Sequence, residues 1–457
     1  MNRIASAVPP STLAALVMAA TAAGCAHYTP APLAAEAALA PDAAALAGMP
    51  SGPLGVGDVV ALAIRRAPVL VAARQRRGVA EAQLVQARVL PNPIVSGAFL
   101  PLISGVGDVP AWSVGLAQDV KSLLVYKPRR RAARDSAHQV QADLLWQEWQ
   151  VAGAARQLAV DIIERERSRA LLDQAFALLQ QRYRVTQAAL AAGNATLVTT
   201  APSALGYQQA RANLQALDQA QLSARHQLNA LLGLVPDAVL PLATTDDVAP
   251  LDIAAVRALI PTLPARRPDL LALRLGYAAQ DETLRAAILG QFPDLVLGGA
   301  ASSDNSRVIN AGPNVQLGLP VFDRNQGNVA IARASRAQLA AEYAARLGTV
   351  VGEVGALLTE TEQIRRQLAV VQRDLPAARI AAARASTAFG ASALDERAYV
   401  DLVTNRFAKE QEVLTLQLAL LDRQVAIEAL IGAGLPQVDT LGLPDPGPNP
   451  GRAGAAR

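Results

Sequence analysis

Residues 66–99 read RAPVLVAARQRRGVAEAQLVQARVLPNPIVSGAF, and residues 266–299 read RRPDLLALRLGYAAQDETLRAAILGQFPDLVLGG. The two stretches share several aligned residues, of which Pro93 and Pro293 are the most informative. Each proline ends an amphipathic run and begins an apolar, alternating one, so each copy is expected to pass from a helix into a strand. The chain therefore contains one structural unit twice.

The duplication continues downstream of these stretches. Gly193 in AAGNATL is matched by Gly390 in AFGASAL, and LNALLG, ending at Gly233, is matched by IEALIG, ending at Gly432. We therefore expect two copies of a helical hairpin with a pair of strands at its end. The function should lie at the axis that the copies surround.

Each repeat is expected to hold a helix, two strands and a long helical hairpin. The first repeat spans residues 54–250 and the second spans residues 251–435. The strands are predicted at about residues 93–100, 112–120, 294–301 and 314–321. The runs between the paired strands are rich in Gly, Pro, Asp and Asn, which predicts exposed loops.

The alternation is clearest around residue 317. Val315, Leu317, Leu319 and Val321 share one face, while Asn314, Gln316 and Gly318 share the other. An apolar outer face and a polar or small inner face over about ten residues are typical of a transmembrane β-barrel. Five aromatic residues near the strand ends form a candidate interfacial girdle: Phe99, Trp112, Tyr126, Phe292 and Phe322.

Long helices follow each strand pair. Leu, Ala and Val recur at three- and four-residue steps from about residue 128 to residue 192, which predicts roughly 95 Å of helix. The second long helix, 328–389, is expected to be interrupted at Pro376. Gly193 and Gly390 are expected to adopt the left-handed conformation that ends a helix, before return helices at about residues 197–232 and 394–431.

The N-terminus indicates where the protein acts. Residues 1–24 combine a short basic start, an apolar core and small residues, as in a secretory signal peptide. Cys25 is the only cysteine and follows directly, so we expect it to be the lipidated first residue of an outer-membrane lipoprotein. Residues 25–53 then form an extended lipid-anchored segment, and residues 436–457 a disordered C-terminal tail.

Four strands cannot close a barrel. Open sheet edges in lipid would leave N–H and C=O groups unpaired at several kcal/mol each. Two copies would supply eight strands, and side chains fill the interior of a barrel of about that size. Three copies supply twelve strands. We therefore expect a homotrimer in which a 12-stranded barrel continues into an α-barrel of long antiparallel hairpins. The fold class is mainly α with a membrane β-barrel contribution.

In this layout the chain resembles the TolC-like outer-membrane efflux proteins. The resemblance covers about residues 54–435 and rests on the duplication, on VLPNP at residues 89–93, on the Gly-x-x-x-Leu turns and on the LLG and LIG helix ends. It implies a passive conduit in the bacterial outer membrane, with its helices in the periplasm, that exports drugs or metal ions. Its implied partners are a periplasmic adaptor (membrane fusion) protein and an inner-membrane pump. VLPNP is most similar to the heavy-metal-exporting branch, and a channel for type I protein secretion is the alternative within this architecture.

The resemblance also implies where the pore narrows and where the adaptor docks. Asp395, Glu396 and Asp401 follow the second turn, where three-fold copies would form a cation-selective ring or, alternatively, lie as solvated acids at a helix start. The implied adaptor-docking tips are Gly193, Asn194, Thr196, Leu197, Gly390, Ser392 and Leu394.

Composition argues against other classes of function. The chain carries 42 basic and 38 acidic residues, without a basic block interleaved with aromatics that would indicate nucleic-acid binding. It contains three histidines and no nucleophile or phosphate-binding motif, so we expect neither an enzyme nor a cofactor or metal site. The competing structural hypothesis is a periplasmic coiled-coil or adaptor lipoprotein, but we find no β-rich adaptor domain.

Overall fold

The computed structural model describes residues 28–437, with the exception of residues 43, 47–51 and 247. The chain divides into two units, residues 1–39 and residues 40–457, and every helix and strand named below belongs to the second. The predicted signal peptide, Cys25 and most of the predicted tail lie outside the described residues. Pro436, at the start of that tail, accepts a hydrogen bond of 2.8 Å from Trp149 Nε1.

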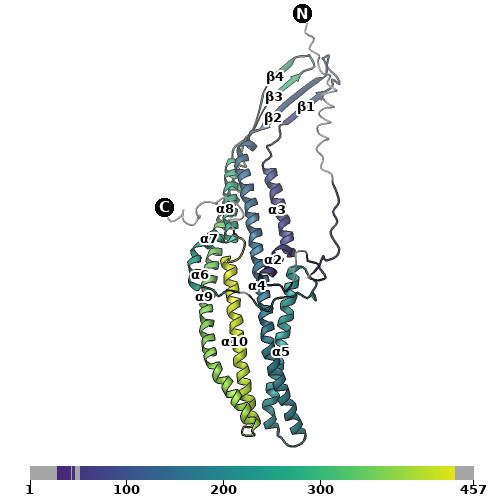
Figure 1. The fold of residues 1–457 in the computed structure, drawn as a ribbon. Helices are drawn as coiled ribbons and strands as arrows, with labels where there is room; N and C mark the ends of the chain where they lie inside the picture. Colours follow the sequence, from purple (N-terminus) through teal and green to yellow (C-terminus); the bar gives the residue numbers. More distant parts are fainter. Residues whose placement is uncertain (1–27, 43, 47–51, 247, 438–457) are drawn as a thin grey trace. The chain divides into compact units, whose positions relative to one another are not determined.

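Both repeats have the same order of elements (Figure 1). The first contains α2 (Val56–Arg66), α3 (Pro68–Ala87), β1 (Ile94–Leu100), β2 (Ala111–Asp119), α4 (Val120–Ala191) and α5 (Leu197–Leu232). The second contains α6 (Ile253–Leu259), the short turn η1 (Ile260–Thr262), α7 (Leu263–Arg266), α8 (Pro268–Leu289), β3 (Asp294–Ser303), β4 (Ile309–Gly318), α9 (Gln326–Gly390) and α10 (Glu396–Ile431).

The long helix α4 begins earlier than the sequence predicted. Asp119 ends β2 and caps α4 by accepting a hydrogen bond of 3.2 Å from the Ser122 amide. Strand therefore passes directly into helix, and Pro128, the predicted start, lies buried within the helix. A side-chain cap satisfies one of the amides that the first helical turn leaves without partners.

The predicted interruption of the second long helix at Pro376 is wrong. Helix α9 continues through this proline from Gln326 to Gly390. A proline inside a helix removes one backbone hydrogen bond. The cost is offset by packing, since α9 lies along α10 and the neighbouring Leu375 is buried.

The four strands form one antiparallel sheet in the order β1-β2-β3-β4. Cross-strand partners point to the same face. One face carries Val95, Phe99, Trp112, Val114, Leu116, Leu295, Leu297, Ile309, Val315 and Leu317, with Gln118 and Ser303 as polar exceptions. The opposite face carries Ser96, Ala98, Ser113, Gly115, Ala300, Ser302, Asn310, Asn314 and Gln316, with Ile94, Leu100 and Val296 as apolar exceptions. Since β4 ends at Gly318, Leu319 and Val321 lie beyond the strand to which they were assigned.

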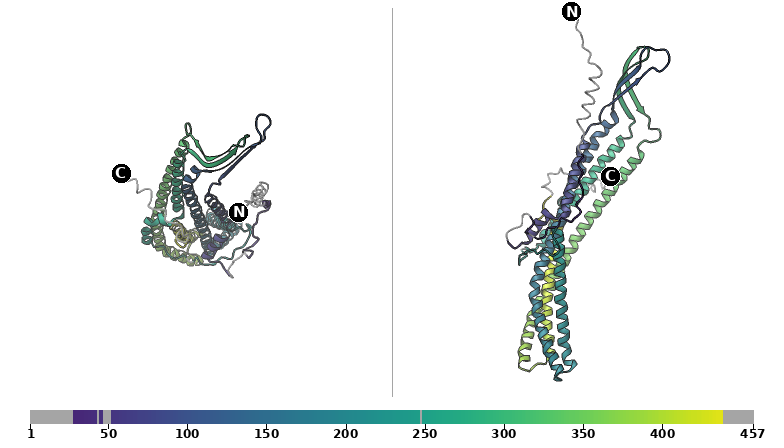
Figure 2. Two further views of the ribbon diagram at one scale, coloured as in Figure 1. Left: turned by 90° about the horizontal axis from the view of Figure 1, so that it is seen from above. Right: turned by 90° about the vertical axis from the view of Figure 1, so that its right-hand side faces the viewer.

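Helix α4 joins the two repeats. It runs from the sheet to the turn before α5, and α9 and α10 lie beside α4 and α5 at that end (Figures 1 and 2). An apolar cluster around Leu62, Val160 and Leu228 packs α2, α4 and α5 together. A second cluster, which includes Leu179 and Tyr399, connects both hairpins near their turns. Each helical hairpin is thereby held against the other within one chain.

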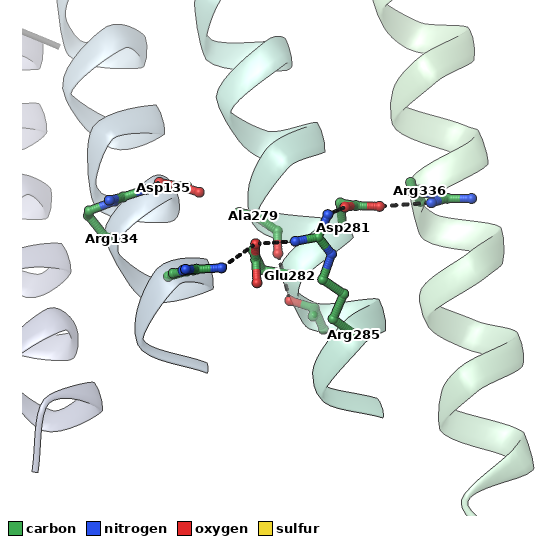
Figure 3. Close-up of polar contacts among 9 residues, drawn as sticks. Arg134, Asp135, Ala279, Asp281, Glu282, Arg285 and Arg336 are labelled. Carbon is green, nitrogen blue, oxygen red and sulfur yellow. Dashed lines mark hydrogen bonds and ion pairs between the residues drawn. The ribbon is translucent and has the colours of Figure 1, made fainter. Parts of the chain in front are cut away.

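Charged residues also link the two repeats just below the sheet. Figure 3 shows Asp281 and Glu282 of α8 pointing to opposite sides. Asp281 pairs with Arg336 of α9 at 2.8 Å, while Glu282 lies 3.7 Å from Arg131 of α4. Arg285 bonds to both acids, so the network links three helices from the two repeats.

Candidate functional site

The turn between α4 and α5 is an exposed tip. Gly193 has φ +75°, the left-handed conformation predicted for it. Thr196 caps α5 by accepting a hydrogen bond of 3.3 Å from the Thr199 amide. Directly after the cap, Leu197 and Val198 are about three-quarters exposed. Two exposed aliphatic side chains beside a capped, hydrogen-bonded turn form a small apolar surface at the tip.

The turn between α9 and α10 has the same backbone hydrogen-bond pattern as the first turn, but a different type of residue adopts the left-handed conformation. The left-handed residue is Ser392, with φ +56°, so the prediction for Gly390 is wrong. Ser392 donates to the Phe389 carbonyl at 3.0 Å, as Gly193 donates to that of Leu190 at 3.0 Å. Gly390 remains the last residue of α9. Hydrogen bonding therefore matches Gly193 with Ser392, two residues beyond the glycine that the sequence pattern selected.

The three predicted acids occupy three different environments. Asp395 is exposed and caps α10 by accepting a hydrogen bond of 2.7 Å from the Ala398 amide. Glu396 is half-buried and forms a bidentate ion pair with Arg182 of α4, in which Arg182 Nε donates at 3.1 Å. Asp401 is exposed, with its carboxylate 3.8 Å from Arg397.

Arg182 explains why Glu396 is held within the chain. Its guanidinium lies 4.5 Å from the centroid of the Phe389 ring and 5.7 Å from that of Tyr399. These two rings stack on each other at 4.6 Å. A cation above aromatic faces and beside a carboxylate is stabilised by both. The sequence does not reveal this contact, since 214 positions separate the partners.

Helix geometry also separates the acids. Successive residues are about 100° apart around a helix, so Glu396 and Asp401 point about 140° apart. Glu396 is in addition held by Arg182, so Asp395 and Asp401 remain the candidates whose side chains are exposed to solvent.

The predicted docking residues are largely exposed. Gly193, Asn194, Thr196, Leu197, Gly390 and Ser392 all lie on the surface. Leu394 differs because it is half-buried and packs against the apolar cluster that contains Leu179 and Tyr399. With Gly193 matched to Ser392, the position of exposed Leu197 is taken by Glu396 at the second tip, so the two tips present different chemistry.

The predicted girdle residues lie at both ends of the sheet. Phe99 and Trp112 are cross-strand partners beside the β1–β2 loop. Phe292 and Phe322 flank β3 and β4 at the helical end, where 57% and 93% of their surfaces are exposed. Tyr126 lies in α4 and donates a hydrogen bond of 2.9 Å to the Arg88 carbonyl.

A carboxylate pair between α4 and α10 was not predicted. Gln157 Nε2 donates to Asp161 Oδ1 at 3.3 Å and to Asp422 Oδ1 at 2.5 Å, which holds the two acids together across the helix contact. Burial, and then the adjacent Asp161 carboxylate, raise the pKa of Asp422 from 3.8 to about 6, whereas Arg165 acts in the opposite direction. Ser223 is at the matching position of the first repeat. This difference between the two copies was the feature of the sequence that could have drawn attention to Asp422.

This pair predicts a pH dependence. Because the pKa of Asp422 is higher in the folded state than in the unfolded state, its contribution to stability is full below about pH 3.8 and is lost as the pH rises through about 6. We expect the free energy of unfolding of Asp422→Asn, relative to that of the wild type, to rise by about 1–2 kcal/mol as the pH goes from 5 to 7.5, after allowance for solvent screening. Thermal melting followed by circular dichroism at both pH values measures this. Parallel pH profiles of the two proteins would contradict it.

Among the helices of the described residues, none combines the length and apolarity needed to cross a membrane. Within the same residues, no three His, Cys, Asp or Glu side chains lie close enough to share a metal ion.

Comparison with known proteins identifies relatives. Residues 259–433 match the family model described as "Outer membrane efflux protein". The curated outer membrane protein OprJ of Pseudomonas aeruginosa is 29% identical over 279 residues, which cover 57% of this chain and 55% of OprJ. The chain thus matches about half the length of this relative.

Solved structures of outer-membrane channels share the fold. The Campylobacter jejuni CmeC channel is similar with a TM-score of 0.68 at 16% identity, over 90% of this chain and 95% of CmeC. The open-state Neisseria gonorrhoeae MtrE channel has a TM-score of 0.64 at 16% identity, over 89% and 98%. CusC has a TM-score of 0.65 at 19% identity, over 85% and 96%. The prediction of a mainly helical chain with a small antiparallel sheet is confirmed.

Proposed function

The family predicted from the sequence, the TolC-like outer-membrane efflux proteins, is confirmed, and on that premise we propose that three copies of this chain form the outer-membrane channel of a tripartite efflux system. The channel is a passive conduit that receives small molecules, drugs or metal ions, from an inner-membrane pump and a periplasmic adaptor. The single observation that supports this most is the two-faced sheet. One face suits lipid and the other suits a water-filled lumen.

The edges of the sheet support the trimer. Strands β1 and β4 each have one neighbour within the chain, and all their residues are exposed. In lipid an unpaired edge is costly, so β1 of one copy pairs with β4 of the next. Three copies of four strands give twelve, enough to enclose a lumen wider than that of an eight-stranded barrel.

The length of the strands supports membrane insertion. The ten residues of β3 extend about 33 Å, and a tilt of about 40° reduces this to about 25 Å along the membrane normal. This equals the apolar band of outer-membrane barrels. Phe99 and Trp112 then lie at one interface, and Phe292 and Phe322 at the other.

The hairpin tips are the proposed periplasmic end. The first tip, with exposed Leu197 and Val198, offers the adaptor an apolar contact. The second tip carries the exposed acids Asp395 and Asp401, which in three copies form the proposed cation-selective constriction.

The channel function is tested with the purified full-length protein. Native mass spectrometry should find trimers, and reconstitution into planar bilayers should give discrete conductance steps. A monomeric protein that produces no steps would refute the proposal.

The constriction predicts a selectivity change. Asp395→Asn combined with Asp401→Asn removes two charges per chain while asparagine retains the cap of α10. We expect the cation-to-anion permeability ratio to fall by at least about twofold and the block by divalent cations to weaken. Arg182→Gln combined with Glu396→Gln is the matched control, because it removes both members of an ion pair and leaves the net charge unchanged. A change in the control alone would place the constriction at this ion pair.

Lipid attachment is proposed at Cys25. Mass spectrometry of the mature N-terminus should find an acylated Cys25, and an unmodified residue there would refute the proposal. Cys25→Ala should still form trimers, since the sheet and helices supply the assembly surface.

A further inference from the structure

A basic segment follows the sheet along the first turns of α4. Residues 127–131 read KPRRR, and they begin about 12 Å beyond the end of β2 at 1.5 Å per residue. Lys127, Arg129 and Arg130 are exposed, whereas Pro128 between them is buried. We call these three exposed side chains the basic collar. They lie at the opposite end of α4 from its hairpin tip, so neither the adaptor contact nor the constriction accounts for them (Figure 1).

The basic collar points away from the packed side of α4. Successive residues are about 100° apart around a helix, so Arg130 points nearly opposite to buried Pro128, and the other two members lie about 100° to either side of this proline. Leu123 is four residues before Lys127 and seven before Arg130, which places it on the same side of the helix. It is 42% exposed. An exposed leucine therefore lies between the sheet and two of the three charges.

The acids near the basic collar have other partners. Those on α4, α8 and β3 are in ion pairs with bases outside the collar: Asp135 with Arg134 at 2.8 Å, Glu282 with Arg285 at 2.9 Å, and Asp294 with Lys121 at 2.7 Å. Among the described residues, no acid forms an ion pair with Lys127, Arg129 or Arg130. Each chain therefore carries three positive charges at this level that its own described residues do not balance.

The opposite end of the sheet lacks such an excess of positive charge. Its two loops, residues 101–110 and 304–308, contain one base, Arg307, and two acids, Asp108 and Asp304. The positive charge is therefore concentrated at the end where the strands pass into the helices. A partner for this surface should carry negative charge and lie at that end of the sheet.

We propose that the basic collar binds the headgroups of anionic phospholipids, such as phosphatidylglycerol, in the membrane leaflet next to the helices. This inference rests on the proposed insertion of the sheet into a bilayer. The headgroup layer is about 5–8 Å deep on each side of the hydrocarbon, and Leu123 lies about 6 Å beyond β2. Lys127 and Arg130 follow it, and such long side chains lay their stems on apolar surface while their charged ends reach the interface.

Charge favours an anionic lipid over a zwitterionic one. Basic residues beside a bilayer are attracted to a negative surface, and an arginine guanidinium can donate two parallel N–H bonds to one phosphate. A zwitterionic headgroup offers the same phosphate but adds a positive group, which the three unbalanced charges of the collar repel. We therefore expect a preference for the net charge of the headgroup.

The test compares spin-labelled phosphatidylglycerol with spin-labelled phosphatidylcholine in phosphatidylcholine vesicles that contain the full-length protein. Electron paramagnetic resonance separates lipid immobilised at the protein surface from free lipid, so the ratio of the two association constants measures the preference. We expect the wild type to prefer phosphatidylglycerol at least about threefold at low salt, and less at high salt. Lys127→Gln/Arg129→Gln/Arg130→Gln, the collar variant, should lower the ratio to about one.

A control variant removes the same charge elsewhere. Arg184→Gln/Arg211→Gln/Arg373→Gln neutralises three exposed arginines on α4, α5 and α9, away from the sheet, and should keep the wild-type ratio. Circular dichroism should show intact helices in both triple variants, because every substituted side chain is exposed.

The possible outcomes separate this inference from the channel proposal. The inference is overturned if the wild type immobilises both lipids equally, if the collar variant keeps the wild-type preference, or if the control loses as much preference as the collar variant. Equal immobilisation of both lipids would still leave the sheet in the bilayer and the channel proposal standing. If neither lipid is immobilised, the sheet does not contact the bilayer, and the channel proposal and this inference fail together.

Discussion

Val114→Arg is expected to destabilise the membrane-inserted protein by about 2–4 kcal/mol, because it places a charge at the midplane of the apolar face. Val114 lies near the centre of β2 and pairs with Gly97 and Ala301 on that face. Urea unfolding in lipid vesicles, or the yield of trimers in outer membranes, measures the loss.

Two matched variants separate charge from position. Ser113→Arg is one residue away but on the opposite face, where its partners are Ala98 and Ser302, so it should be tolerated. Leu317→Arg is on the apolar face but one residue from the end of β4, where the cost near the interface falls to about 0–1 kcal/mol. Equal effects at Val114 and Ser113 would show that the apolar face does not contact lipid.

Arg267→Met is expected to destabilise the helical part by about 3–5 kcal/mol, because it breaks a fully buried ion pair. Arg267 is 0% exposed and donates to both oxygens of Asp269, at 3.0 and 2.7 Å. It also donates to the Leu430 carbonyl at 2.8 Å, and its guanidinium lies 4.7 Å from the Trp146 ring centroid. One side chain thus joins α8, α10 and α4.

The double variant Arg267→Met/Asp269→Leu tests the reason for that loss. Asp269 also accepts a hydrogen bond of 2.7 Å from Arg346 Nε, so without Arg267 the buried carboxylate keeps this one, partly exposed partner. If the loss of its buried partner causes most of the destabilisation, removing both buried charges should recover more than half of the stability. Arg336→Met is the control in the partly exposed network below the sheet, where the pair with Asp281 should contribute about 0–1 kcal/mol. Thermal unfolding by circular dichroism ranks the three. A double variant as unstable as the sum of both single changes would contradict this account.

The sequence alone determined the local elements of this protein. Alternation with period two located three strands to within two residues, because side-chain direction alternates along any extended backbone. The start of β4 was missed by five residues, since residues 309–313, predicted as loop, belong to the strand. Recurrence at three and four residues located the long helices for the equivalent reason. The duplication then predicted the order of elements, and Gly193 was recognised because its left-handed conformation favours glycine.

Only the tertiary structure decided which residues meet. Nothing local distinguishes Ser392 from Gly390 as the turn residue, since the choice depends on the hydrogen bonds that end α9. From the sequence Glu396 is expected to be a free acid, and only the folded structure shows that Arg182 of the other hairpin pairs with it. The pKa of Asp422 is likewise raised by burial and by Asp161 of another helix. Period and turn chemistry act between neighbours in the chain, whereas pairing and desolvation act between segments brought together by packing.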